Sequence, residues 1–147
     1  MYWASDKLIW IPLYVFFLYL IIRYYKKNSV WVIVSAIFMI VVSDQLSVHA
    51  FKNVFQRLRP CHEHELVGLV HLVKNKCGGD FGFVSSHAVN HFAMAVFFSV
   101  IFYKKIKYFI PLIMLWAAFI SYSRVYLGVH YPGDVICGGL TGAAIGF

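Results

Sequence analysis

Short polar stretches divide the chain into five apolar segments, and this division limits the available folds more than any other feature. The segments are 8–22, 30–48, 86–103, 108–122 and 132–147. A helix needs about 20 residues to cross a bilayer, and about 17 are tolerated. The second and third segments reach that length, and the first and fourth do so with their flanks. The last rises about 24 Å at about 1.5 Å per residue, which is short. We therefore predict an all-α integral membrane bundle with about five spanning helices.

The composition agrees with a membrane protein of one domain. Of the 147 residues 61% are hydrophobic and 13% are charged, whereas a soluble domain carries about 25% charged residues. We expect a single transmembrane domain over residues 1–147, with truncation at either end left open. No cleavable signal peptide is expected, because the first segment runs into basic residues without a small-residue cleavage site. The net charge of +7 lies in groups at the ends of apolar segments, so we expect the bilayer and no nucleic acid as partner.

Two basic clusters predict the orientation in the membrane. The clusters are Arg23, Lys26 and Lys27, and Lys104, Lys105 and Lys107. If the segments alternate in direction, both clusters lie on one face, and the positive-inside rule makes that face cytoplasmic. The loops 51–85 and 123–131 then share the extracytoplasmic face. The longer loop is itself basic, with Lys52, Arg57, Arg59, Lys74 and Lys76. We resolve this conflict by assigning Lys52 and Arg59 to substrate binding.

His130 and Asp134 have a spacing that suits a nucleophile and the carboxylate that orients it. If Pro132 opens the last segment in its first turn, Asp134 lies about one helical turn after His130. The carboxylate would fix the tautomer of the ring and leave the other nitrogen nucleophilic. An acidic residue near a helix start is stabilising in itself, so a simple capping role stays open.

Three cations are candidates for binding phosphate oxygens. Arg124 ends the fourth segment on the same side as His130, and its guanidinium offers planar donors. Lys52 and Arg59 lie on that side as well. Each of the three could instead be an interfacial anchor that snorkels to lipid headgroups.

The third segment begins with polar residues, Ser85, Ser86 and His87. The backbone amides and the Ser85 hydroxyl could hold an anion at the helix N-terminus, with His87 near a leaving group. Capping by serine is the alternative, and both can hold. One face of the segment carries His87, Asn90, His91 and Met94. Such a face on a spanning helix must look into the bundle or a wet cavity.

Taken in order, these motifs resemble the type 2 phosphatidic acid phosphatase superfamily, which includes membrane lipid phosphatases and vanadium haloperoxidases. The first family motif is matched by Lys52, Arg59 and Pro60, and the third in full by Ser123, Arg124, His130 and Asp134. The second, Pro-Ser-Gly-His, reads Val84-Ser85-Ser86-His87 here, so the serine and histidine are kept while Pro and Gly are not. The resemblance covers about 43–146. The family typically has six spanning helices, which implies that an N-terminal helix is missing here.

The resemblance implies a lipid phosphatase that needs no metal and no cofactor. His130 would attack phosphorus and form a phosphohistidine, Asp134 would hold the imidazole, and His87 would protonate the leaving oxygen. The implied phosphate-binding residues are Lys52, Arg59, Ser85, Ser86 and Arg124. The substrate would be a phosphorylated membrane lipid at the outer face of a cytoplasmic membrane. Undecaprenyl pyrophosphate fits a bacterial source; phosphatidic acid, phosphatidylglycerol phosphate and a lipid A phosphate are equally compatible.

Two other functions compete with this prediction. Seven histidines could make a haem-binding membrane cytochrome, but no second helix has a central histidine. The intact His130, His87 and Arg124 argue against a catalytically dead scaffold. No metal-ligand spacing is shared by His49, His62, His64 and His71. We favour a helix-lining support role for His91, and expect Asp44 to pair with a basic residue of another helix or to reach the interface.

Cys61 and Cys77 bracket one polar loop. If that loop is extracytoplasmic, the compartment favours a disulfide. The bridge would close 17 residues counted inclusively from 61 to 77 and stabilise the fold by about 3 kcal/mol. It would also hold Arg59 near the second motif. Two free thiols are the alternative, and Cys137 is expected to be a small packing residue.

Overall fold

Five helices of 15 to 18 residues form a bundle in the computed structural model, which describes residues 1, 3, 6–66, 68–70, 72–73 and 77–147. They are α1 Ile11–Tyr25, α2 Ser29–Leu46, α4 Ser86–Phe102, α5 Phe109–Tyr126 and α6 Pro132–Gly146. Shorter helical turns cover Lys7–Trp10, Lys26–Asn28 and His64–Leu66. Within the described ranges the one extended pairing is the isolated bridge between Leu58 and Phe81.

Two stretches are long and apolar enough to cross a membrane. They are Leu8–Phe55, which turns back at Lys26–Asn28, and Phe109–Tyr126, with mean hydropathies of 1.9 and 1.4. The helix α4 is apolar but slightly shorter. Large apolar side chains cover the outer surface of the bundle, among them Trp31 and Leu112, as suits a surface that faces lipid. The predicted all-α membrane bundle is confirmed.

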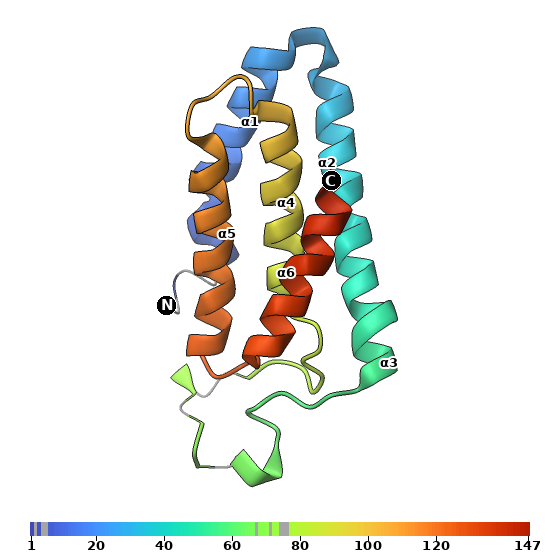
Figure 1. The fold of residues 1–147 in the computed structure, drawn as a ribbon, viewed down its shortest axis with the longest axis vertical. Helices are drawn as coiled ribbons and strands as arrows, with labels where there is room; N and C mark the ends of the chain where they lie inside the picture. Colours follow the sequence, from blue (N-terminus) through green and yellow to red (C-terminus); the bar gives the residue numbers. More distant parts are fainter. Residues whose placement is uncertain (2, 4–5, 67, 71, 74–76) are drawn as a thin grey trace.

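The helices alternate in direction around α4, which runs through the centre of the bundle (Figure 1). The α1–α2 turn and the α4–α5 loop lie at one end, which we call the basic end because it carries both predicted basic clusters. The loop 56–85 and the α5–α6 loop lie at the other, which we call the motif end (Figure 1). All three motifs therefore meet at one end of the molecule.

A stripe of glycines lets α6 lie directly on α4. The stripe consists of Gly138, Gly142 and Gly146. A Cβ added at Gly142 would collide with the backbone oxygen of Val89, and the same holds at Gly146 against Ala93. Small residues at a spacing of four permit such a close helix contact. It brings the two helix starts together, where the backbone N–H of Ser85 donates to the carbonyl oxygen of Asp134 at 3.1 Å.

Helix α2 does not end with its apolar segment. It continues through a π-helical stretch, Ser47–Lys52, and a last turn, α3 Asn53–Phe55, before Gln56 at φ 46° ends it. The Ser47 hydroxyl donates to the carbonyl oxygen of Asp44 at 2.8 Å at the start of the wider turns. The predicted start of the long loop at residue 51 was therefore wrong, and Lys52 lies on a helix. Such π-helical turns occur frequently at functional sites.

Aromatic packing holds α1 and α5 against α4. The ring centroids of Phe17 and Phe98 are 4.6 Å apart, and those of Phe102 and Phe109 are 5.2 Å apart. At the basic end the Tyr25 hydroxyl donates to a carbonyl oxygen of α4 at 2.8 Å. These contacts close the bundle at that end, while a cavity remains between α1, α2 and α4 nearer the motif end.

Candidate active site

His130 lies in the loop between α5 and α6, and Asp134 in the first turn of α6. Their side chains are 2% and 0% exposed. The Nδ1 of His130 is 3.5 Å from Oδ2 of Asp134 and has no shorter hydrogen bond among the described residues. Because Nδ1 faces the carboxylate, Nε2 is the nitrogen that can act as a nucleophile.

The surroundings favour the neutral form of this ring. Burial lowers the pKa of His130 below its usual value of 6.5, contact with Asp134 offsets part of this, and the charges of Arg59 and Arg124 lower the pKa again. A neutral imidazole is the nucleophilic form. The guanidinium charges of Arg59 and Arg124, from the first and third motifs, therefore both favour the neutral form of the His130 ring.

Asp134 is held from three sides. Its Oδ2 accepts a hydrogen bond from the backbone N–H of Tyr131 at 3.0 Å, which caps α6. Its Oδ1 accepts one from Nη1 of Arg57 at 3.2 Å. The predicted alternative, a helix cap, is thus present together with the contact to His130, so one carboxylate serves both purposes.

Arg57 was not recognised as a site residue from the sequence. Its guanidinium lies 4.2 Å from the ring centroid of Tyr131 while it bonds Asp134, 77 residues away. Leu58 pairs with Phe81 in the isolated bridge, and extended backbone places residues 57 and 59 on the same side. The signal that could have identified Arg57 was its position two residues before Arg59, because alternate residues of an extended segment face the same side.

Arg59 is buried, with 8% of its surface exposed. Its Nε donates to the carbonyl oxygen of Phe81 at 3.3 Å, and its Nη1 to that of Cys77 at 3.2 Å. Burial lowers the pKa of Arg59, while Asp134 and Asp80 oppose that shift. The side chain is therefore fixed by the backbone of the loop that follows it.

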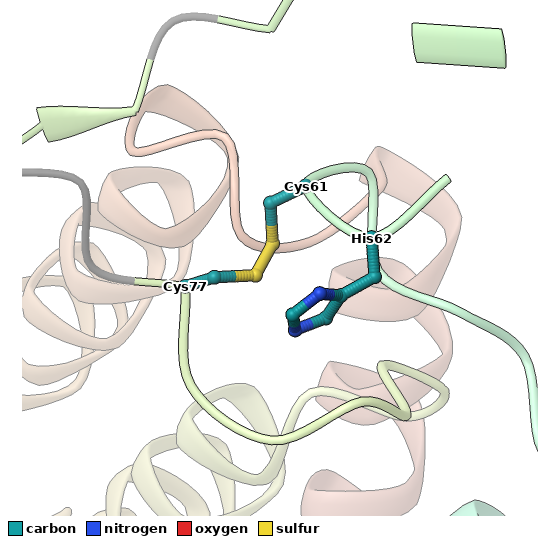
Figure 2. Close-up of side chains that lie close together, drawn as sticks. All are labelled: Cys61, His62 and Cys77. Carbon is teal, nitrogen blue, oxygen red and sulfur yellow. A yellow bond between two sulfur atoms is a disulfide. The ribbon is translucent and has the colours of Figure 1, made fainter. Parts of the chain in front are cut away.

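A disulfide joins Cys61 to Cys77, with 6.1 Å between the Cα atoms (Figure 2). The bridge holds the carbonyl oxygen that receives Nη1 of Arg59. The ring of His62 lies beside it (Figure 2), and these three side chains are the one group of His, Cys, Asp or Glu ligands in the described part of the chain with metal-binding spacing. Because the two sulfurs are bonded to each other, they are not metal-binding thiolates. His71 lies outside the described residues.

Lys52 reaches from the extended helix to the start of α4. Its Nζ donates to Oγ of Ser86 at 2.7 Å, and the Ser86 hydroxyl is also 2.8 Å from that of Ser47. Arg59 and Arg124 are close enough to repel the Lys52 charge. The three predicted cations are therefore gathered around one place, where an anion would relieve their mutual repulsion.

The buried polar atoms without a hydrogen-bond partner among the described residues include two donors near these cations, the hydroxyl of Ser85 and Nε of Arg124. The side chain of Ser85 makes no cap hydrogen bond, so the predicted capping role was wrong. The backbone N–H of Ser85 is used instead on Asp134. Buried donors in native proteins are normally satisfied, and a phosphate oxygen would accept from both.

The polar face of α4 looks into the cavity between α1, α2 and α4, as predicted. The cavity measures about 470 Å³, and Ser86, His87, Asn90 and His91 line it. The rings of His87 and His91 are parallel, with centroids 6.0 Å apart, and Nδ1 of His91 lies 2.7 Å from the carbonyl oxygen of His87. Neither His130 nor Asp134 lines this cavity. Of the residues predicted to form the site, Ser86 and His87 are the two that line this cavity.

Comparison with known proteins gives one family. A family model described as the PAP2 superfamily matches residues 33–147. The chain is 36% identical over 140 residues to a lipid A 4'-phosphatase of Bacteroides thetaiotaomicron, which covers 94% of this chain and 61% of that protein. It is 33% identical over 148 residues to a lipid A 4'-phosphatase of Porphyromonas gingivalis, covering 99% and 61%. It is also 33% identical over 143 residues to an undecaprenyl-diphosphatase of Sulfolobus acidocaldarius, covering 97% and 63%. The chain thus spans about three fifths of the length of these relatives, and no solved structure matches it.

Proposed function

The chain belongs to the PAP2 superfamily, and on that premise we propose that it hydrolyses the phosphate or pyrophosphate group of a membrane lipid. In this proposal residues 1–147 act as one transmembrane phosphatase domain. The observation that carries it is the buried His130–Asp134 pair, which lies within electrostatic range of Arg59 and Arg124. We set aside haem binding, because the relatives that match this chain are named as phosphatases.

The first chemical step forms a phosphohistidine. The Nε2 lone pair of His130 attacks phosphorus, the N–P bond forms, and the bond from phosphorus to the leaving lipid oxygen breaks. His87 gives its proton to that oxygen, so the lipid leaves as a neutral alcohol or as a lipid phosphate. Asp134 stabilises the positive charge that develops on the ring.

The second step returns the enzyme to its starting state. The now neutral His87 takes a proton from water, the hydroxide oxygen attacks phosphorus, and the N–P bond breaks to release inorganic phosphate. In both steps Lys52, Arg59 and Arg124, together with the Ser85 hydroxyl and the Ser86 backbone N–H, bind the non-bridging oxygens. Preorganised charge of this kind is usually the largest catalytic contribution, and it takes the place of a metal ion here.

We also propose that the motif end faces the extracytoplasmic side of a cytoplasmic membrane. The clusters at the basic end favour a cytoplasmic position for that end. The basic residues of the motif end weigh less in this comparison, because Lys52, Arg57 and Arg59 are hydrogen-bonded within the site. Lys74 and Lys76 lie outside the described residues. Among substrates, undecaprenyl pyrophosphate and a lipid A phosphate fit the activities by which the relatives are named.

The proposal is tested by phosphate release from a panel of lipid phosphates. The wild-type protein should release phosphate, and His130→Ala should abolish turnover. Asp134→Asn should leave a small residual rate, because the ring remains but is poorly oriented. Trapping of an acid-labile phosphoenzyme in the wild type, and its absence in His130→Ala, would identify the nucleophile. Wild-type turnover by a well-folded His130→Ala protein would refute the assignment.

A further inference from the structure

The cavity between α1, α2 and α4 has two chemically different parts. Its basic-end part is formed by apolar side chains such as Phe17, Ile33 and Phe98. Its motif-end part is polar and is lined by Asp44, Asn90 and other groups next to His87. The polar part therefore adjoins the proposed site at Ser86 and at His87, the proposed proton donor to the leaving oxygen.

Asp44 has an unusual position for a carboxylate. It lies 15 residues after Ser29, or about 22 Å along the helix at about 1.5 Å per residue, which is within the depth of a bilayer core of about 30 Å. Among the described residues it has no ion pair within 4 Å, and its carboxylate accepts one long hydrogen bond, from Nδ2 of Asn90 at 3.4 Å. The expected pairing with a basic residue of another helix is not found there. Ionisable groups at such depth are unfavourable and usually functional.

Asn90 is fixed in a way that holds Asp44 toward the cavity. The Oδ1 of Asn90 accepts a hydrogen bond from the Ser43 hydroxyl at 2.6 Å, which leaves its amide N–H groups to face Asp44. Asp44 itself is exposed, so its carboxylate oxygens have room for further donors.

The same part of the cavity is rich in acceptors. Because Nδ1 of His91 faces the carbonyl oxygen of His87 at 2.7 Å, it carries the proton, and Nε2 of the neutral ring is an acceptor. Asp6 adds a second carboxylate to the lining. The acceptors Asp44, Asp6 and His91 thus line the same cavity as His87, with the Lys52 ammonium within electrostatic range of Asp44.

We propose that the polar part of this cavity binds the leaving group of the substrate. It selects lipid phosphates that carry hydroxyl, amide or ammonium donors beside the phosphoester oxygen, and Asp44 is the main acceptor. Lipids without such donors displace water from the Asp44 carboxylate on binding and offer no hydrogen bond in its place, which is unfavourable. This inference rests on the proposed phosphatase function and narrows its substrate class.

The test compares four substrates with the full chain in lipid nanodiscs. A glucosamine-based lipid phosphate and phosphatidylglycerol phosphate carry donors, whereas phosphatidic acid and undecaprenyl pyrophosphate carry none beside the scissile group. The wild type should have at least about 10-fold higher kcat/KM on the donor-bearing pair, as a hydrogen bond to a charged acceptor provides. Asp44→Leu should lower kcat/KM roughly 10- to 100-fold on that pair and leave the donor-free pair within about twofold.

Two further variants keep the result interpretable. Gln45→Leu removes a neighbouring exposed polar group that does not line the cavity, and it should change neither pair. Asp44→Asn keeps the shape of the side chain and should lose part of the preference even if Asp44→Leu folds poorly. Equal rates of the wild type on both pairs, or equal losses on both in either Asp44 variant, would overturn the inference. Failure of the wild type to release phosphate from any lipid would instead overturn the proposed function, and the inference with it.

Discussion

Replacement of Arg57 by glutamine tests the role of Asp134 from a residue that no motif includes. The change removes the donor 3.2 Å from Oδ1 of a fully buried carboxylate. A hydrogen bond to a charged group contributes about 1.5–3 kcal/mol. Since the Arg57 side chain is 48% exposed, water screens the pair, and we take the lower value of about 1.5 kcal/mol. Loss of the cation–π contact with Tyr131 adds about 0.5 kcal/mol.

A total of about 2 kcal/mol corresponds to a rate loss of up to about 30-fold. We expect kcat to fall about 10- to 30-fold in an assay of phosphate release against substrate concentration, with KM within about twofold. The pH profile should also change. Asp134 raises the pKa of His130, so a misplaced carboxylate should move the acid limb of kcat/KM to lower pH. A simple loss of folded protein lowers kcat without moving this limb.

Two companion variants define what would contradict this reasoning. Arg57→Lys keeps the charge without the planar fork and should recover part of the rate. Arg23→Gln removes an exposed arginine at the basic end and should have no effect. An unchanged kcat for Arg57→Gln would show that Asp134 does not depend on Arg57. A raised KM with normal kcat would show that Arg57 binds the substrate phosphate instead.

Four other outcomes are expected. Because burial lowers the pKa of His130 below 6.5, the ring stays neutral as the pH falls to that value, and an acid limb of kcat/KM centred above it would contradict the assignment. Phosphate release should persist in EDTA and be inhibited by orthovanadate; loss on chelation with recovery in Mg²⁺ would refute the metal-free mechanism. Non-reduced peptide mass spectrometry should find Cys61 and Cys77 joined, and serine at both positions should lower the free energy of unfolding by about 3 kcal/mol; alkylation of both without reductant would reject the bridge. In intact cells an impermeant thiol reagent should label Glu65→Cys but label Lys104→Cys only after lysis, and the reverse pattern would invert the topology.

The helices could be predicted from the sequence because lipid-facing and core-facing residues are both apolar in a membrane bundle. All five helices begin within three residues of the predicted starts. The polar face of α4 and the glycine stripe of α6 were also visible, since each repeats at helical spacing. Where a helix continued into polar sequence, as α2 does through Lys52, hydropathy gave the wrong boundary.

From the sequence we could predict the site residues that belong to the three motifs, but not the residues that contact them from outside the motifs. The pair of Arg57 with Asp134 depends on how the loop 56–85 folds back over α6, and the pair of Asp44 with Asn90 depends on how α2 crosses α4. Neither arrangement follows from local spacing. Ser85 resembles a helix cap in sequence, but its N–H is used by Asp134 on another helix. The partners of these side chains are thus set by tertiary contacts, which local sequence patterns do not reveal.

The α4–α6 glycine contact and the cavity wall formed by α1 and α2 differ in how well they tolerate amino-acid substitution. Any side chain at Gly142 must push the helices apart, because it meets backbone rather than a side chain that can move. Separation there would also pull Ser85 from Asp134 and so disturb the proposed nucleophile, His130. The cavity wall formed by α1 and α2 has no such restriction, since flexible side chains such as Leu18 and Ile37 line it. If the proposed function holds, single substitutions in that wall alter which lipid fits without touching His130 or Asp134, so a new substrate preference can evolve one residue at a time.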